Sequence, residues 1–267
     1  MKFAVSNIGW AQHDDAGVLG MLRESGVQGI EVAPTKIWPD WKQASFQQAQ
    51  QYKESMLDNG FEIPAMQAIL FGKPELQVFD ASTHAEFLEH TRRVAELANG
   101  LGAKVLVFGA PKNKKRGQMP YQQAFDMAAD FFYKMADICL SQACCIGLEH
   151  NPVEYGCDFI TNMLDARELV DRVDHQGFKL HIDSAGLHMC GGEITESLGK
   201  AGQFVHYHIS EPMLEPVFEG VVDHMAALKT LKTGGYDQWV SIEMKQPEHD
   251  EQLTRSVELV SSLLKKL

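Results

Sequence analysis

The chain has 267 residues, 45% of them hydrophobic, and a formal net charge of −12. This length and hydrophobic content suffice for a large core, so we predict one domain over residues 1–267. The negative charge disfavours binding to nucleic acid or to an anionic membrane surface, and we expect neither as a partner.

Neither a membrane span nor a secretion signal is expected from the sequence. No apolar run approaches the length of about 18 residues that crosses a bilayer, and the first ten residues, MKFAVSNIGW, are typical of a strand rather than a signal peptide. The five cysteines are odd in number and form no CxxC pair, which favours reduced thiols. We therefore expect a cytoplasmic location.

Eight short apolar segments recur along the chain, separated by longer helical patterns. The predicted strands are 2–9, 29–33, 62–69, 104–110, 145–150, 178–183, 204–210 and 239–244. Most are continuous apolar runs, as is typical of parallel strands covered by helices. Strands that alternate with helical segments indicate βαβ units. Eight such units in a chain of this length favour an α/β fold, the (β/α)8 TIM barrel, over an open sheet.

Local signals predict where several helices begin and end. Thr83 and Glu86 have the spacing of a capping box, and Gly100 or Gly102 is expected to end the helix that follows. Asp223 is expected to cap the eighth helix at its N-terminus. These signals support the alternation of strands and helices along the whole chain.

Polar residues end the last four predicted strands. They are Glu149, Asp183, His208 and Glu243. In a barrel, the C-terminal ends of the strands meet at one mouth, where active sites lie. Three carboxylates that converge there repel one another unless a cation lies among them. Oxygen ligands with one histidine nitrogen suit Mn²⁺, Mg²⁺ or Co²⁺, with Zn²⁺ as a further candidate, so we predict one divalent metal ion. For each residue alone, a helix cap or a salt bridge is the alternative.

Sequence motifs around these residues resemble a known superfamily. GLEHNP, HIDSAG, HYHISE and GYDQWVSIEM are similar to segments of the xylose isomerase-like TIM barrel superfamily of sugar isomerases and epimerases. GVQGIEV and LGAKVLVFG are similar to its second and fourth strands, so the resemblance covers nearly the whole chain. It implies a metal ion held by the same four residues, Glu149, Asp183, His208 and Glu243.

The resemblance also implies a reaction. In the ketose 3-epimerase branch, two metal-bound glutamates face each other across the substrate and move a proton at the carbon next to a carbonyl, through an enediolate. Glu149 and Glu243 hold these positions here. We therefore expect a metal-dependent isomerase or epimerase of a sugar or sugar phosphate. A polyol dehydratase of the inosose type, using the same metal site, is one alternative. A sugar-binding barrel without turnover is another.

Five further residues are candidates for substrate contacts: Gln67, Lys112, Asn151, His188 and Glu211. His188 follows Asp183 by five positions, whereas the epimerase branch has a substrate-binding histidine three positions after its aspartate. Lys112 begins a basic stretch, 112–116, which indicates either an anionic group on the substrate or a solvated loop. The Asn-Arg pair that often follows the histidine in that branch is replaced here by PMLEP.

Two other expectations concern the interior and the assembly. His206 shares a strand face with His208, because side chains alternate with period two, and we expect it inside the barrel below the site. Oligomers are frequent in the superfamily, which leaves a homo-oligomer open.

Overall fold

The computed structural model describes residues 1–11, 15–40, 44–249 and 251–267. Eight parallel strands form one sheet in the order β2-β1-β8-β7-β6-β5-β4-β3. Their bounds are β1 Lys2–Ser6, β2 Gly29–Glu31, β3 Ala65–Met66, β4 Val105–Phe108, β5 Cys145–Leu148, β6 Phe178–Asp183, β7 His206–Ser210 and β8 Trp239–Glu243. Two isolated bridges join β2 to the β3 segment, so the sheet is a nearly closed barrel. The predicted (β/α)8 TIM barrel is confirmed.

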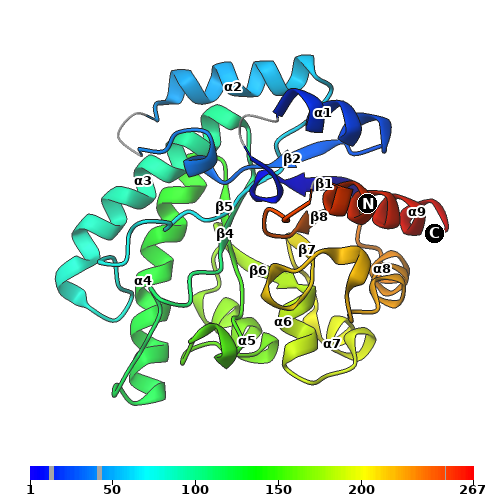
Figure 1. Ribbon diagram of the computed structural model, residues 1–267. Coiled ribbons are helices and arrows are strands. Elements are labelled where there is room, and N and C mark those ends of the chain that lie inside the picture. Colours follow the sequence, from blue (N-terminus) through cyan, green and yellow to red (C-terminus); the bar gives the residue numbers. More distant parts are fainter. Residues whose placement is uncertain (12–14, 41–43, 250) are drawn as a thin grey trace.

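Helices surround the barrel (Figure 1). They are α1 Asp15–Glu24, α2 Phe46–Asp58, α3 His84–Leu101, α4 Tyr121–Ser141, α5 Met163–Val173, α6 Ser184–Met189, α7 Ile194–Ala201, α8 His224–Thr233 and α9 Glu251–Lys265. None of the helices in the described ranges is both long enough and apolar enough to cross a membrane. All five cysteines are free, as expected for reduced thiols.

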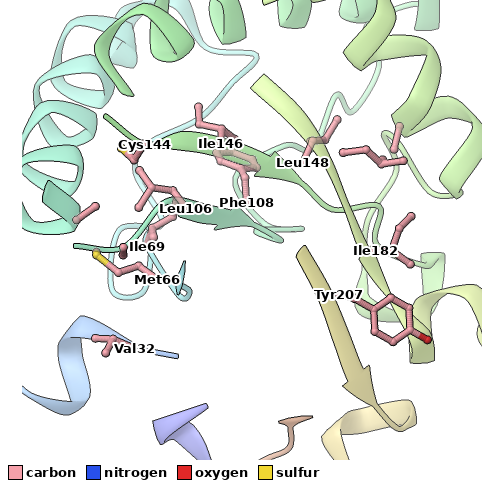
Figure 2. Packing of buried hydrophobic residues seen from close by; sticks show 14 of the residues in the cluster. Val32, Met66, Ile69, Leu106, Phe108, Cys144, Ile146, Leu148, Ile182 and Tyr207 are labelled. Carbon is pink, nitrogen blue, oxygen red and sulfur yellow. The ribbon is translucent and has the colours of Figure 1, made fainter. Parts of the chain in front are cut away.

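The hydrophobic core lies between the strands and the helices. Alternate strand residues, among them Leu106, Ile146 and Ile182, are buried in this cluster (Figure 2). Full burial of such a side chain stabilises the fold by about 1.5–3 kcal/mol. A small separate cluster of Ala65, Val105 and Val107 fills part of the barrel interior. The remaining interior positions toward the C-terminal ends of the strands are polar, and these form the candidate site.

Several predicted boundaries need correction, among them that of the strand predicted over 2–9, which ends at Ser6 because Asn7–Gly9 form a 3-10 turn. The strand predicted over 62–69 is limited to Ala65–Met66, because Pro64 lacks a backbone N–H and Ala68 adopts a left-handed φ of 53°. The predicted capping box of Thr83 and Glu86 is wrong, since the Thr83 side chain does not cap α3 and Asp80 instead caps a preceding 3-10 turn.

Two predicted helix termini are confirmed. Gly102, with a φ of 80°, ends α3 in the left-handed conformation that glycine adopts most readily. The Asp223 carboxylate accepts a backbone N–H from the first turn of α8.

Candidate functional site

Three of the predicted ligands meet at the C-terminal ends of neighbouring strands. Asp183 ends β6, His208 lies in β7 and Glu243 ends β8. Nδ1 of His208 is 3.1 Å from Oε2 of Glu243 and 3.9 Å from Oδ2 of Asp183. One potential ligand atom from each residue lies within 4.8 Å of the others. The parallel register of β6, β7 and β8 produces this arrangement.

Glu149 joins the same group from the end of β5. Its carboxylate forms a second cluster with His181 and His208, again with ligand atoms within 4.8 Å of one another. Nε2 of His181 is 3.5 Å from Oε2 of Glu149. Glu149 and Glu243 also line one cavity, so the structure brings all four predicted residues together at one mouth of the barrel.

Hydrogen bonds fix the orientation of two of these carboxylates. Oδ1 of Asp183 accepts the backbone N–H of Gly186 at 2.6 Å, and Oδ2 accepts the hydroxyl of Ser210. Oε1 of Glu149 accepts the amide of Asn151 at 2.7 Å. These bonds hold the oxygens in place before any ligand arrives.

The close carboxylates change one another's ionisation. Burial, together with Asp183 and Glu243, raises the pKa of Glu149 to about 8. Burial and Glu243 raise the pKa of Asp183 to about 6. Burial opposes the charge of His208, but the carboxylates of Glu31 and Glu243 outweigh it and hold the pKa of His208 well above its usual value. Extra positive charge is therefore favourable at this site.

The donor atoms fit a divalent cation. Nδ1 of His208 is buried and has no hydrogen-bond partner within the described ranges of the chain. It faces oxygens of Asp183 and Glu243, and the Glu149 carboxylate lies alongside. Carboxylate oxygens with one imidazole nitrogen suit Mn²⁺, Mg²⁺, Co²⁺ or Zn²⁺. A cation there would satisfy the unpartnered nitrogen and relieve the repulsion among the carboxylates.

A cavity of about 450 Å³ opens beside this cluster, and both Glu149 and Glu243 line it. Its other walls are mostly apolar: Ile8, Ala68, Ile69, Leu70, Phe71, Val107, Gly109, Ala110, Pro111 and Leu214, with Gln67, Lys112 and Asn113 as polar members. The volume lies within the usual range for small-molecule sites.

Comparison with known proteins identifies the family. The family model described as xylose isomerase-like TIM barrel matches residues 19–263. The chain belongs to this family. No curated protein sequence matches the chain.

Several solved structures share this fold. A D-psicose 3-epimerase from Clostridium cellulolyticum H10 is 14% identical, with a TM-score of 0.77 over 100% of this chain and 98% of that one. The probable 3-DHS dehydratase AsbF from Bacillus anthracis is 16% identical, with a TM-score of 0.76 over 99% of each chain. The IolI protein, solved with a bound zinc atom, is 21% identical, with a TM-score of 0.72 over 100% and 96%. At these identities the likeness establishes the fold alone.

Three of the predicted substrate contacts lie at the site of this xylose isomerase-like barrel. Gln67 and Lys112 line the cavity, and the Gln67 amide donates to the Ser6 hydroxyl. Asn151 is buried against Glu149, and its Oδ1 has no partner within the described residues. Their contact with substrate stays a prediction.

The other two predicted contacts lie in different surroundings. His188 is exposed on α6, and no hydrogen bond or ion pair in the described ranges joins it to the metal-ligand cluster. Glu211 is 1% exposed, and its carboxylate accepts the backbone N–H of Val221 at 2.8 Å and pairs with Nε2 of His224 at 2.7 Å. These contacts with Val221 and His224 favour a structural role for Glu211 over contact with a substrate.

The basic stretch 112–116 does not act as one unit. Lys114 is fully buried, and its ammonium donates to the backbone carbonyl of Glu149 at 2.6 Å. Burial lowers its pKa. Arg116 donates to the carbonyls of Asp158 and Met119. Of the basic residues in this stretch, Lys112 is therefore the one that lines the cavity.

Sequence reasoning missed Glu31. It ends β2, is fully buried, and accepts hydrogen bonds from His206 and His208 inside the barrel. The only signal was a charged residue within an otherwise apolar strand, GIEVA. His206, by contrast, lies in the interior as expected, 1% exposed.

Proposed function

We propose that this protein is a divalent-metal-dependent isomerase or epimerase of a sugar or sugar phosphate. The observation that carries the proposal is the position of Glu149 and Glu243, which line one cavity beside Asp183 and His208. The names of solved structures with this fold, among them a D-psicose 3-epimerase and an L-ribulose 3-epimerase, support the substrate class.

The metal site and the acid/base pair would share residues. Glu149, Asp183, His208 and Glu243 would hold the ion, which when bound polarises the substrate carbonyl and stabilises negative charge on its oxygen. One of the two glutamates removes a proton from the carbon next to that carbonyl. The other returns a proton to the opposite face for epimerisation, or to the neighbouring carbon for isomerisation.

The cavity walls limit the substrate further. Phe71, Pro111 and Leu214 present apolar surface, so hydroxyl groups against them would lose their hydrogen bonds to water without replacement. Lys112 is the one cation among the described lining residues, and it could pair with a phosphate or carboxylate. We propose a substrate whose hydroxyls cluster near the reacting carbons and whose far end is apolar or carries a single anionic group.

Solvent deuterium exchange tests the proposal. Purified protein with Mn²⁺ or Mg²⁺ is incubated in D₂O with a panel of ketoses and ketose phosphates, and NMR follows label at each carbon. Glu243→Gln and Glu149→Gln should each lower exchange and turnover by at least about 100-fold, the usual contribution of a general acid or base. Glu219→Gln, which changes an exposed glutamate near the same mouth, should leave both rates unchanged. Full activity of Glu243→Gln would refute the assigned role.

A dehydratase is the second candidate. Glu149 and Glu243 line the same cavity, so one could remove the proton next to the carbonyl while the other donates a proton to a departing hydroxyl group. The fold is also shared with a probable 3-DHS dehydratase. The same NMR samples distinguish the two, since dehydration gives a new olefinic or methylene signal and loss of water. A sugar-binding barrel would show binding without label or product.

A further inference from the structure

Glu31 lies inside the barrel, directly beneath the predicted metal ligands. It ends β2 and is 0% exposed, so water cannot solvate its carboxylate. Oε1 and Oε2 lie 3.0 and 3.1 Å from Nε2 of His208, and Oε2 lies 3.0 Å from Nε2 of His206. A buried ionised carboxylate needs such donors, because an unpaired one is very costly.

These contacts assign the two nitrogens of His208 different tasks. Glu31 is an acceptor, so Nε2 of His208 carries the proton that it donates. Nδ1 points the other way, 3.1 Å from Oε2 of Glu243 and 3.9 Å from Oδ2 of Asp183. It is buried, with no hydrogen-bond partner in the described ranges. The imidazole therefore joins two sites, with a carboxylate at one nitrogen and the predicted metal position at the other.

We propose that Glu31 is the positioning residue for the metal ligand His208, fixing Nε2 as the protonated nitrogen and Nδ1 as the nitrogen that binds the ion. This inference rests on the metal site of the proposed function. A carboxylate behind a metal-bound histidine holds the ring and makes the ligand nitrogen more basic, and its loss typically weakens metal affinity 10- to 100-fold. Glu31 does not contact the ion or the substrate in this role.

The nearest alternative is a second ion held by Glu31, His206 and His208. Their ligand atoms also lie within 4.8 Å of one another. The Glu31–His206 and Glu31–His208 distances of 3.0 Å are already those of hydrogen bonds, however, so both histidines satisfy the carboxylate without an ion. The two accounts differ in stoichiometry, with one ion per chain for the positioning role and two for the alternative.

Two variants separate the positioning role from general damage to the interior. Glu31→Gln keeps the shape of the side chain but removes its charge, and the amide offers one acceptor oxygen where two histidines donate. His206→Gln removes the other partner of Glu31 and leaves the predicted metal ligands intact. A merely structural role of this network predicts similar effects of both variants on the metal site.

Calorimetric titration of the EDTA-treated proteins with Mn²⁺ and with Zn²⁺ provides the first measurement. We expect one ion per wild-type chain, affinity at least 10-fold weaker in Glu31→Gln, and affinity within about threefold of wild type in His206→Gln. If Glu31→Gln bound metal as tightly as the wild type, the positioning role of Glu31 would be overturned, but the proposed function would stand. Two ions on the wild type, one of them lost in Glu31→Gln, would also overturn the positioning role. No binding by the wild type would overturn the proposed function as well.

Nitrogen NMR of the wild type gives a second measurement that needs no variant to fold. In Zn²⁺-loaded protein labelled with ¹⁵N at histidine, His208 should show a metal-bound Nδ1 and a protonated Nε2 in slow exchange with solvent. A protonated Nδ1 with metal on Nε2 would contradict the proposal, whatever the affinities of the variants.

Discussion

Gly109 leaves the space that the Glu149 carboxyl fills. A Cβ at position 109 would lie 2.6 Å from Oε2 and 2.7 Å from Oε1 of Glu149, closer than a Cβ atom approaches other heavy atoms in proteins. We predict that Gly109→Ala displaces this carboxyl and lowers metal affinity and turnover at least 10-fold. The obstructed atoms are the end of a flexible side chain, so the free energy of unfolding should change by less than about 1 kcal/mol. Manganese titration and urea unfolding check both parts.

Gly20→Ala is the matched control for that substitution. Gly20 lies within α1, and a Cβ there meets nothing within 4 Å. Alanine in a helix interior should stabilise the protein by about 0.5–1 kcal/mol and leave metal affinity unchanged. If Gly109→Ala bound metal as tightly as the wild type, displacement of the Glu149 carboxyl would not weaken metal binding, and the prediction would be wrong.

Some residues of the candidate site could be predicted from the sequence, and others could not. Asp183 and Glu243 could be predicted because each is a carboxylate that closes an apolar strand. Glu31 could not, because its partners His206 and His208 lie more than 170 residues away in the chain. Lys114 was also missed, since a lysine within a basic stretch is typical of a solvated loop, whereas here it is buried behind Glu149.

At the scale of elements, the β7–α8 loop is organised around Glu211. Its carboxylate accepts the backbone N–H groups of Val221 and Val222 and pairs with His224. Gly220 packs so closely that a Cβ there would overlap the Glu211 carboxyl. We predict that Glu211→Gln leaves one buried donor unpaired, lowers the free energy of unfolding by about 1–3 kcal/mol and speeds amide exchange at Val221 and Val222.

Glu219→Gln serves as the control in the same loop, because this glutamate is exposed and should change stability by no more than about 0.5 kcal/mol. Unchanged stability and exchange in Glu211→Gln, together with a raised KM, would instead favour the substrate contact that the sequence predicted for Glu211.

The bounds of a strand could be predicted where a continuous apolar run ended at a residue that also begins the next element. Phe178–Asp183 emerged within the predicted bounds because the run FKLHID is continuous and its last residue also caps α6. The third strand was predicted too long, because apolar composition over 62–69 does not reveal how few of those residues pair with β4. The length of this pairing depends on how β4 lies beside the segment, and the sequence of residues 62–69 does not reveal that.

At the scale of the whole molecule, the barrel interior is unusually polar. Barrels of this type are typically filled with layers of branched apolar side chains. Here the upper layers hold carboxylates and imidazoles: Glu31, Glu149, Asp183, Glu243, His181, His206 and His208. The extensive apolar cluster outside the strands must supply the stability that this interior does not. Bound cation should therefore contribute strongly to the stability of the fold.

The pH dependence of stability should report this balance. In the unfolded chain Glu149 is ionised at pH 7, because its ordinary pKa is 4.5, whereas in the metal-free folded protein its pKa is about 8. The folded state therefore binds more protons, and its stability should fall as pH rises from 7 to 8.5, by about 1 kcal/mol from this group. The raised pKa of His208 acts in the same direction, whereas the lowered pKa of the buried Lys114 acts in the opposite one.

Urea unfolding of EDTA-treated protein across this pH window measures the effect. Glu149→Gln should reduce the slope, since the neutral amide does not titrate. Saturating Mn²⁺ should also reduce it, because metal binding requires an ionised Glu149 and displaces the proton. Equal slopes in wild type and Glu149→Gln would contradict a protonated Glu149 in the metal-free protein, and with it the crowding of carboxylates on which the metal site depends.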